Sequence, residues 1–398
     1  MTMKRCLSSI GMISIIFLSQ SIVVFSNPIK DNYEHAFETW YYVDDEPGSG
    51  PNNPPEDFTS IQDAIDAVSE GDTIFVYNGM YKEHLFIVKA IKLLGESKYD
   101  TIIDAERKDN TIWVLSPNVT IFGFRIINSI NNRFSAGIHV RDKYIHISNC
   151  FLQYNDCGIR VEQTSDVSIE KCLITNNYGL SIYVIAASNV SITYCNMYYN
   201  GDGVSYYGGI CITNSEIYGM HSNILVQNCS IHDNIGAGID VGNPWENLVY
   251  KDVMIEHNQI VNNTNYGIFL CASIVTVRNN IIAVNGYNRS FDGGIMLQDV
   301  HGLATIQNNI LSNNKNGIYF LRSTDNTIQN NNFISNTKQQ IGFTYNDSIT
   351  SYNYLINNYY SDLKFPWMKI IGGLYINKIV LPLINIEWNP ATKPHDLS

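Results

Sequence analysis

The sequence predicts an all-β protein, a single-stranded parallel β-helix with three short strands per coil and one capping helix near the N-terminus. Two observations lead to this prediction. A Gly-apolar-x-apolar unit recurs along the chain, as in Gly137–Val140 and Gly317–Phe320. Its glycine returns every 21 to 30 residues, at positions 137, 158, 179, 209, 238, 267, 294 and 317. Three short strands in such a period are typical of a β-helix solenoid.

The strands within each interval follow one pattern. The glycine unit forms one strand, a [VI]-x-[IV] unit forms a second, and a short apolar pair such as Ser230-Ile231 forms a third. Alternate side chains of a strand point to opposite faces, so every second residue of these units is expected inside. We expect the repeating body to span residues 59–360.

The start of this body has helical rather than strand periodicity. Residues 59–68 place four apolar side chains on one helical stripe, and Thr59 or Ser60 can serve as the N-cap. Gly71-Asp72 then ends the helix. The helix would cover the apolar end of the stacked strands. Alternating strands are expected after it, at residues 73–77, 85–88, 91–94, 101–103, 111–115 and 119–127.

The two ends of the chain break the repeat. Residues 1–26 combine Lys4 and Arg5 with an apolar run, which predicts a secretory signal peptide; an uncleaved N-terminal anchor is the alternative. An acidic, Pro/Gly-rich segment follows at residues 27–58. Residues 361–398 are expected to form a C-terminal cap and tail, and a membrane-associated hairpin is the less favoured alternative. No other segment is long and apolar enough to cross a bilayer, so the mature chain is expected to be secreted or at the cell surface.

The composition narrows the choice of partners. Apolar residues make up 45% of the chain and charged residues 16%, with a formal net charge of −12. The acidic balance, without a cluster of Lys and Arg, argues against nucleic acid. A polyanionic polysaccharide would also be repelled unless a metal or a local basic patch intervened. The six N-x-S/T sequons suit a secreted protein.

Several stretches carry a resemblance to a known family. "DDEPGSGPNNPPEDFTSIQDAIDAVSEGDTIFVYNGMY", "IKLLGES" and the repeating "TIQNNNF" and "GIYF" units resemble the right-handed parallel β-helix repeat proteins of the pectate-lyase-like superfamily. The tail "PLINIEWNPATKPHD" is similar to that of secreted NosD-like proteins. The resemblance implies a right-handed solenoid, and its NosD branch implies an association with copper delivery. The scaffold carries many functions, so the resemblance implies the fold more than the activity.

One column of the predicted helix holds small polar residues. In eight successive coils, the residue three positions after the central apolar residue of the second strand is a Cys or an Asn: Cys150, Cys172, Cys195, Cys229, Asn258, Asn280, Asn309 and Asn331. Four thiols suggest a soft-metal site for copper. A tetrahedral site needs ligands that converge, however, whereas a column spreads them along a line. We therefore expect no metal site, a ladder of mutually bonded asparagines, and buried free thiols or at most one disulfide.

A second column carries charged residues and the catalytic candidates. The positions beside each glycine are expected to be exposed: His139, Arg160, Ser181, Cys211, Asp240, Phe269, Met296 and Tyr319. The next outward positions along the same strands are Arg141, Glu162, Tyr183 and Thr213. His139, Arg141, Arg160, Glu162 and Asp240 are candidates for binding a uronate and removing its C5 proton. A solvated surface is the simpler interpretation. The chain lacks the diagnostic motifs of polygalacturonases, pectate lyases and mannuronan epimerases.

The long insertions between coils are aromatic and are expected to line a binding surface. Planar rings flanked by Asn and Asp suit sugar faces and hydroxyls. The predicted ligand-binding residues are Tyr198, Tyr206, Tyr207, Trp245, Tyr250 and Tyr287. Packing within the insertions themselves is the alternative role. Asp202, Glu246 and Asp292 are acidic candidates for Ca²⁺, although their spacing matches no calcium loop.

The sequence therefore predicts a secreted or cell-surface β-helix protein that interacts with carbohydrate or is structural, with a polysaccharide or surface glycan as its partner. Catalysis is not expected from its motifs. Two alternatives stay open: a polysaccharide lyase or epimerase acting on a uronic-acid polymer, and a NosD-like copper-handling accessory protein.

Overall fold

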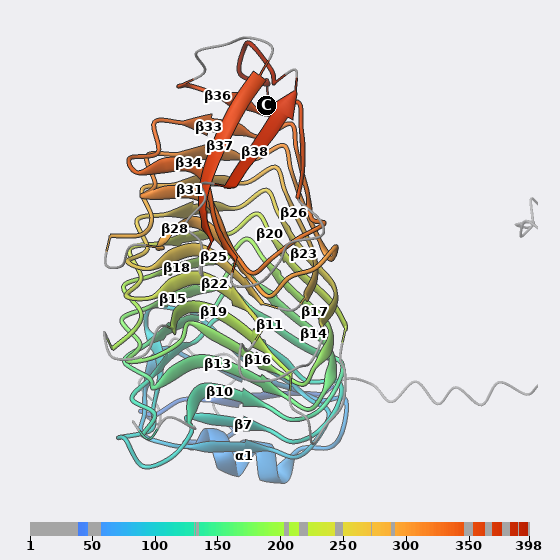
Figure 1. Cartoon of the computed structure of the whole chain (residues 1–398). Helices are drawn as coiled ribbons and strands as arrows, with labels where there is room; N and C mark the ends of the chain where they lie inside the picture. The colour runs from blue at the N-terminus through green and yellow to red at the C-terminus, as the bar shows by residue number, and fades with distance from the viewer. Residues whose placement is uncertain are drawn as a thin grey trace, which may run out of the picture. The chain divides into compact units, whose positions relative to one another are not determined.

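The fold is a right-handed parallel β-solenoid of three sheets with one short helix, as predicted. The computed structural model describes residues 39–46, 57–130, 132, 135–202, 207–214, 222–242, 250–271, 273–287, 291–345, 353–362, 368–375, 383–388 and 390–396. Figure 1 shows the coils stacked in sequence order, from α1 (Ile61–Ala67) in blue to the C-terminal strands in red.

The strands enter three sheets in rotation, so neighbours in a sheet are three strands apart in sequence, except at β1 and β38. Sheet A contains β1 (Trp40–Val43), β2 (Thr73–Val76), β5 (Lys92–Gly95), β8 (Thr120–Phe122), β11 (Ile145–Ser148), β14 (Ser165–Glu170), β17 (Ser188–Thr193), β20 (Ser222–Gln227), β23 (Tyr250–Glu256), β26 (Ser273–Arg278), β29 (Ala304–Gln307), β32 (Thr327–Gln329) and β35 (Tyr354–Ile356). Sheet B contains β3 (Gly79–Tyr81), β6 (Thr101–Asp104), β9 (Arg125–Ile127), β12 (Phe151–Gln153), β15 (Leu173–Thr175), β18 (Asn196–Tyr198), β21 (Ser230–His232), β24 (Gln259–Val261), β27 (Ile281–Ala283), β30 (Ile310–Ser312), β33 (Asn332–Ile334) and β36 (Tyr359–Tyr360). Sheet C contains β4 (Leu85–Ile87), β7 (Ile112–Val114), β10 (Ala136–Val140), β13 (Cys157–Glu162), β16 (Ile182–Ile185), β19 (Tyr207–Thr213), β22 (Ala237–Val241), β25 (Tyr266–Cys271), β28 (Gly293–Gln298), β31 (Asn316–Leu321), β34 (Gln339–Tyr345), β37 (Met368–Tyr375) and β38 (Leu383–Trp388).

The apolar residues of the repeat meet in vertical register inside the solenoid. Ile138 of β10 pairs with Ile159 of β13, which pairs with Ile182 of β16, and all three are fully buried. Because the side-chain period of a strand is two, this register sends the whole inward set of each strand to the core. The buried residues of all three sheets form one continuous hydrophobic cluster.

Asparagine and glycine allow the sharp corners between strands. Many corner residues have a left-handed backbone, including Asn149 and Asn176, and Asn tolerates this conformation better than most residues. Gly123, with φ of +82°, divides the predicted 119–127 strand into β8 and β9. An added Cβ there would lie 2.4 Å from the carbonyl oxygen of Gly95. The predicted strand is therefore two strands, β8 in sheet A and β9 in sheet B.

The helix begins at the expected cap. The Ser60 side chain accepts a hydrogen bond from the Asp63 amide at 3.2 Å. The Glu83 carboxylate accepts from the amides of Ile61 and Gln62 at 3.0 and 2.9 Å. Satisfying these amides stabilises a helix of only seven residues. Its buried face, including Ile61, packs against the first strands of the solenoid.

The predicted phase is wrong in one coil. Gly179 is not in the strand but at the corner before it, where its amide donates to the Asp156 carbonyl. Ser181 occupies the glycine position beside Gly158, and its hydroxyl donates to the Gly208 carbonyl at 3.0 Å. The register is fixed because the buried Ile159 pairs with the buried Ile182. Tyr183, not Ser181, therefore faces outward beside Arg160.

The C-terminal strands depart from the parallel pattern. β37 pairs in parallel with β34, and β38 returns antiparallel to β37. Glu387 on β38 is fully buried and accepts from the amide nitrogen of Asn358 at 2.6 Å and from its side chain at 3.2 Å. Among the helices that the structure describes, none has the length and hydropathy of a membrane span.

Candidate functional site

The predicted column of cysteines and asparagines is a single file in the interior. Asn258 Nδ2 donates to Asn280 Oδ1 at 3.0 Å, and the same bond at 3.0 Å joins Asn280 to Asn309. The file continues through Asn331 and ends at Asn358, whose side chain donates to Glu387. Each asparagine thus satisfies its neighbour, as expected.

The thiols of this file are buried and free, also as expected. The Cys150 thiol contacts the Ser148 carbonyl oxygen at 3.4 Å, and the Cys172 thiol contacts the Glu170 carbonyl oxygen at 3.4 Å. Burial raises the pKa of Cys150 well above its ordinary value. A thiol is the form that suits a buried structural position, whereas metal ligation requires the thiolate.

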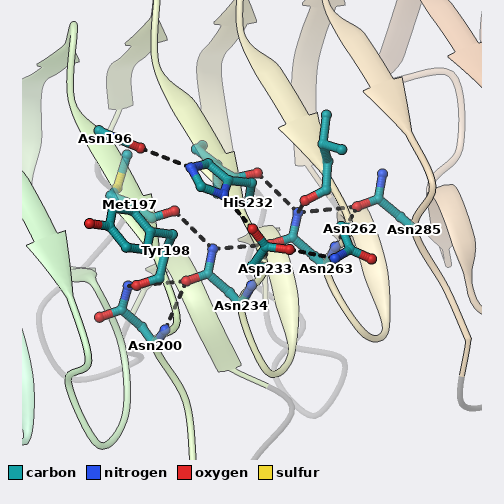
Figure 2. Close-up of polar contacts among 12 residues, drawn as sticks. Asn196, Met197, Tyr198, Asn200, His232, Asp233, Asn234, Asn262, Asn263 and Asn285 are labelled. Carbon is teal, nitrogen blue, oxygen red and sulfur yellow. Dashed lines mark hydrogen bonds and ion pairs between the residues drawn. The ribbon is translucent and has the colours of Figure 1, made fainter.

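A second asparagine file was missed at the sequence level. Asn200 Nδ2 donates to Asn234 Oδ1 at 3.0 Å, and Asn234 donates to Asn263 at 3.0 Å (Figure 2). The file comprises Asn155, Asn177, Asn200, Asn234, Asn263, Asn285, Asn314 and Asn336. Each member stands five residues after a member of the first file, and that spacing was the available signal.

The second predicted column lies on the outward side of sheet C, but it is buried. His139 is 3% exposed, Arg160 9% and Asp240 8%. The expectation of an exposed, solvated row is therefore wrong for these residues. The register places Trp113, His139, Arg160, Tyr183, Cys211, Asp240, Phe269, Met296 and Tyr319 in this row.

Glu162 is the centre of a polar cluster on this side of sheet C. Three basic side chains reach its Oε2 atom: His139 Nε2 at 2.9 Å, Arg160 Nε at 3.0 Å and Arg141 Nη1 at 3.4 Å. The Arg160 guanidinium also lies over the Tyr183 ring, 5.3 Å from its centroid. The structure therefore brings together four of the five catalytic candidates.

Burial and the neighbouring charges determine the protonation state of the His139 imidazole. Burial, with a smaller contribution from Arg160, lowers the pKa of His139 to about 4, so the ring is neutral near pH 7. Burial acts to raise the pKa of Glu162, but its bonds to Arg160 and His139 outweigh burial and hold that pKa below its ordinary value. An ionised carboxylate only accepts, so the proton of the His139 ring is on Nε2 and Nδ1 has a bare lone pair.

The His139 ring, whose Nδ1 atom carries no proton, stacks on a tryptophan. The Trp113 indole stacks on the His139 ring, with centroids 4.3 Å and planes 23° apart. Trp113 Nε1 and His139 Nδ1 are both buried, and neither has a hydrogen-bond partner among the residues that the structure describes. One is a donor and the other an acceptor, and leaving each unpaired costs about 1–3 kcal/mol.

Asp240, the fifth candidate, lies apart from the cluster. Four strand steps separate β22 from β10, which carries His139. At about 4.8 Å per step the two strands are roughly 19 Å apart. An acid and a base must both reach one substrate, so Asp240 and His139 do not form a pair for a single sugar ring. Burial raises the pKa of Asp240 to about 8, and within the described part of the chain its Oδ1 atom has no hydrogen-bond partner.

An aromatic stack lies on the outward face of sheet B. Tyr198 of β18 and His232 of β21 are register partners, and their rings stack with centroids 5.0 Å and planes 10° apart. Tyr199 makes an edge contact with Tyr198, at 5.1 Å between centroids, and is 57% exposed. Figure 2 shows Tyr198 and His232 beside the second asparagine file.

Polar groups surround this stack. His232 Nδ1 contacts Asp233 Oδ2 at 2.6 Å, and His232 Nε2 contacts Asn196 Oδ1 at 3.2 Å. Asn262 donates to the other oxygen of Asp233. Despite partial burial, the bonds from His232 and Asn262 lower the pKa of Asp233, which is therefore an ionised acceptor. The face thus combines planar rings with amide and carboxylate groups.

The other predicted aromatic residues do not join this stack. Tyr206 and Trp245 lie outside the described residues. Tyr207 and Tyr250 begin β19 and β23, and their side chains are not described. Tyr287 is 54% exposed and follows β27, three strand steps along sheet B from β18.

The described residues offer no candidate metal centre. Among them, no group of three or more His, Cys, Asp and Glu side chains is placed to hold a metal ion. Glu246, one of the three acidic residues considered for Ca²⁺, lies outside the described part, whereas Asp292 is 1% exposed and Asp202 is exposed.

Two family models match adjacent parts of the chain. Residues 101–247 match the right handed beta helix region, and residues 251–364 match the periplasmic copper-binding protein (NosD) family. With the three parallel sheets, these matches identify the fold as a right-handed β-helix, and residues 251–364 are similar to the NosD family. A search of curated proteins gives no match.

Solved structures share the fold at low identity. The A-module of Azotobacter vinelandii mannuronan C-5 epimerase AlgE4 aligns with a TM-score of 0.57 at 17% identity, covering 75% of this chain and 90% of that one. The Agl-KA catalytic domain aligns with a TM-score of 0.58 at 13% identity, covering 80% and 68%. XylC with bound xylose aligns with a TM-score of 0.50 at 10% identity, covering 84% and 88%. These likenesses show the fold alone.

The name of the NosD family raises the question of whether copper fits the thiol file. The file runs along the interior, each thiol contacts backbone carbonyls, and burial disfavours the Cys150 thiolate. Cu(I) requires deprotonated ligands that converge on one point. These residues therefore do not fit copper.

Proposed function

We propose that this chain is an extracytoplasmic carbohydrate-binding protein that holds a polysaccharide against sheet B without turning it over. The observation that carries the proposal is the half-buried stack of Tyr198 on His232, with the exposed ring of Tyr199 at its edge. Aromatic rings with one open face and adjacent polar groups suit a sugar ring and its hydroxyls. Asp233 and Asn262 supply these polar groups beside the stack.

The same corner of the solenoid offers a second ring. Tyr154 follows β12 as Tyr199 follows β18, and Tyr154 is 44% exposed. The register of β12, β15 and β18 places Tyr154 two coils from Tyr199, a separation of roughly 10 Å. Asn176 stands at the intervening coil. The face therefore has the length to contact more than one sugar of a polymer.

The test is a glycan-array screen of the mature chain, followed by calorimetry with the best glycan. Tyr199→Ala is expected to raise the dissociation constant roughly 5- to 30-fold, because losing one stacked ring costs about 1–2 kcal/mol. Tyr194→Ala is the matched control, because Tyr194 lies before β18 in the same coil and is also 57% exposed. Equal losses in the two variants, or no loss in either, would contradict the proposed face.

A polysaccharide lyase or epimerase is the second candidate function. It is favoured by one observation, the bare Nδ1 of His139 beside Arg141 and Arg160, since a neutral imidazole can accept a proton. Incubation with a panel of uronans would test it through the absorbance of unsaturated products and the epimer ratio of the polymer. Absence of product from every uronan, with the glycan still bound, would leave binding as the function.

A further inference from the structure

The outward side of sheet C contains two polar atoms of complementary chemistry that no described residue satisfies. Trp113 Nε1 only donates, and His139 Nδ1, as its bond to ionised Glu162 dictates, only accepts. The two rings are stacked with centroids 4.3 Å apart, so the two nitrogens belong to adjacent rings and one oxygen atom is the smallest group that could serve both. That oxygen must accept one hydrogen bond and donate another, which a hydroxyl group does and a carboxylate or carbonyl does not.

The charge around the pair is positive, in contrast to the chain as a whole. Arg141 and Arg160 carry two positive charges against the one negative charge of Glu162, because His139 is neutral near pH 7. The side chain of Arg141 is 37% exposed, whereas that of Arg160 is 10% exposed. Arg141 is thus the cation that an anion can reach, and a guanidinium suits a carboxylate.

We propose that Trp113, His139 and Arg141 form a second ligand site, which binds a carboxylate that carries a hydroxyl group. The hydroxyl bridges Trp113 Nε1 and His139 Nδ1, and the carboxylate pairs with Arg141. Glu162 and Arg160 are positioning residues: Glu162 fixes the tautomer of His139, and Arg160 neutralises Glu162. This site lies on a different sheet from the aromatic stack, so it does not depend on the carbohydrate binding proposed for sheet B. It shares His139 and Arg141 with the lyase or epimerase candidate, which differs from it in requiring a product.

Calorimetric titrations at low salt with defined probes test the ligand class. Gluconate and a trigalacturonate distinguish a free hydroxy acid from the acidic unit of a polysaccharide, and binding of either supports the class. Glucose lacks the carboxylate and propionate lacks the hydroxyl, so each should bind at least tenfold more weakly. Equal binding of propionate would overturn the hydroxyl contact, and no binding of either acidic probe at millimolar concentration would overturn the site.

Two conservative variants locate the site. Arg141→Gln should raise the dissociation constant at least tenfold, because the bond to a charged group is lost. Trp113→Phe keeps the stacked ring and removes only the N–H, so about a 2- to 10-fold loss is expected. Arg107→Gln is the control, since Arg107 is an arginine paired with Tyr178, 5.6 Å from that ring, away from the cluster. Equal losses in Arg141→Gln and Arg107→Gln would refute the site.

NMR of the parent chain tests the hydroxyl contact directly, without variants. The ¹⁵N resonance of His139 Nδ1 should have the shift of a bare imidazole nitrogen in the free protein and move towards that of a hydrogen-bonded one on adding gluconate. A hydrogen-bonded shift before ligand is added, unchanged afterwards, would show that an interior water satisfies the pair and would overturn the proposal.

Discussion

The substitution Asp240→Asn should change how the free energy of unfolding depends on pH. Asp240 is 8% exposed, and burial raises its pKa to about 8, while the same group has a pKa near 3.9 in an unfolded chain. Three groups that face it, Cys211, Tyr266 and Cys271, are neutral at pH 7, and burial raises the pKa of each of them. The folded state therefore retains a proton that the unfolded state releases.

The sign of the effect follows from proton binding. Because the folded state binds the extra proton, the contribution of Asp240 to stability is fully present below about pH 4 and is lost as pH rises towards 8. The slope is about 1.4 kcal/mol per pH unit, so raising the pH from 5 to 8 costs about 4 kcal/mol. Asparagine has similar volume and does not titrate, so it removes this slope.

His139 has the opposite effect over part of the range. Its folded pKa of about 4 lies below the unfolded value of 6.5, so its contribution is present above pH 6.5 and is lost as pH falls towards 4. Between these limits the two slopes have similar size and opposite sign. The stability of the parent chain should therefore change little with pH between 4 and 6.5 and fall above 6.5, whereas the stability of Asp240→Asn should rise up to pH 6.5 and then level off.

Urea unfolding of the parent chain and of Asp240→Asn, at pH 5, 6, 7 and 8, measures the difference directly. The stability of the variant relative to the parent should increase by about 1.4 kcal/mol for each pH unit. The same series with His139→Gln should show a relative gain that is largest at pH 5 and disappears by pH 7. A stability difference for Asp240→Asn that stays constant across the four pH values would refute the assignment of a buried, protonated carboxyl group.

Three further predictions concern the interior and the cap. Asn309→Ala should lower the free energy of unfolding by about 3–5 kcal/mol, because the Asn309 side chain makes five hydrogen bonds of 3.0 Å, three to neighbours in the file and two to backbone carbonyls. Asn313→Ala at an exposed corner should cost about 1 kcal/mol, and equal costs in urea unfolding would contradict the ladder. Glu387→Ala should cost about 3 kcal/mol or more, because the amide and side chain of Asn358 and the hydroxyl of Tyr360 all donate to Glu387. Glu387→Gln, which keeps one acceptor oxygen, should lose less, and the reverse order in urea unfolding would be inconsistent with a capping acceptor. Cys150 and Cys172, as buried thiols whose pKa is raised, should resist a thiol reagent until the chain is unfolded; rapid labelling of the folded protein at either would refute their burial.

The interior of the solenoid could be predicted because stacking imposes the same requirement on every coil. The inward position occupied by Ile138, Ile159 and Ile182 must bury an apolar side chain in register with its neighbours, and the sequence shows this period directly. The Cys and Asn file follows from the same rule, since an amide at one coil can bond the amide at the same position of the next. Even so, the coil with Gly179 was placed two residues out of phase, because Ser181 fills the glycine position there.

The outward side could be predicted only in part, because alternation says which face a residue takes but not what covers that face. His139 and Arg160 were placed in one column correctly, and their contact with Glu162 follows from that placement. Their burial does not follow from alternation, because it depends on which rings the neighbouring coils place over them, Trp113 on His139 and Tyr183 beside Arg160. Trp113 was not predicted at all, because β7 precedes the first clear glycine unit, and only the pairing of β7 with β10 places it against His139.

The inward and outward sides of the strands are under different constraints, which explains why the fold is easier to establish than the function. A substitution on the inward side is opposed by the coils above and below, so the inward residues repeat. A substitution on the outward side meets no such requirement, so departures from the repeat accumulate there, and His232, Tyr198 and Trp113 are all departures of this kind. Residues that break the period on a face whose neighbours keep it are therefore where binding chemistry should be sought, and both proposed sites meet this criterion on separate sheets.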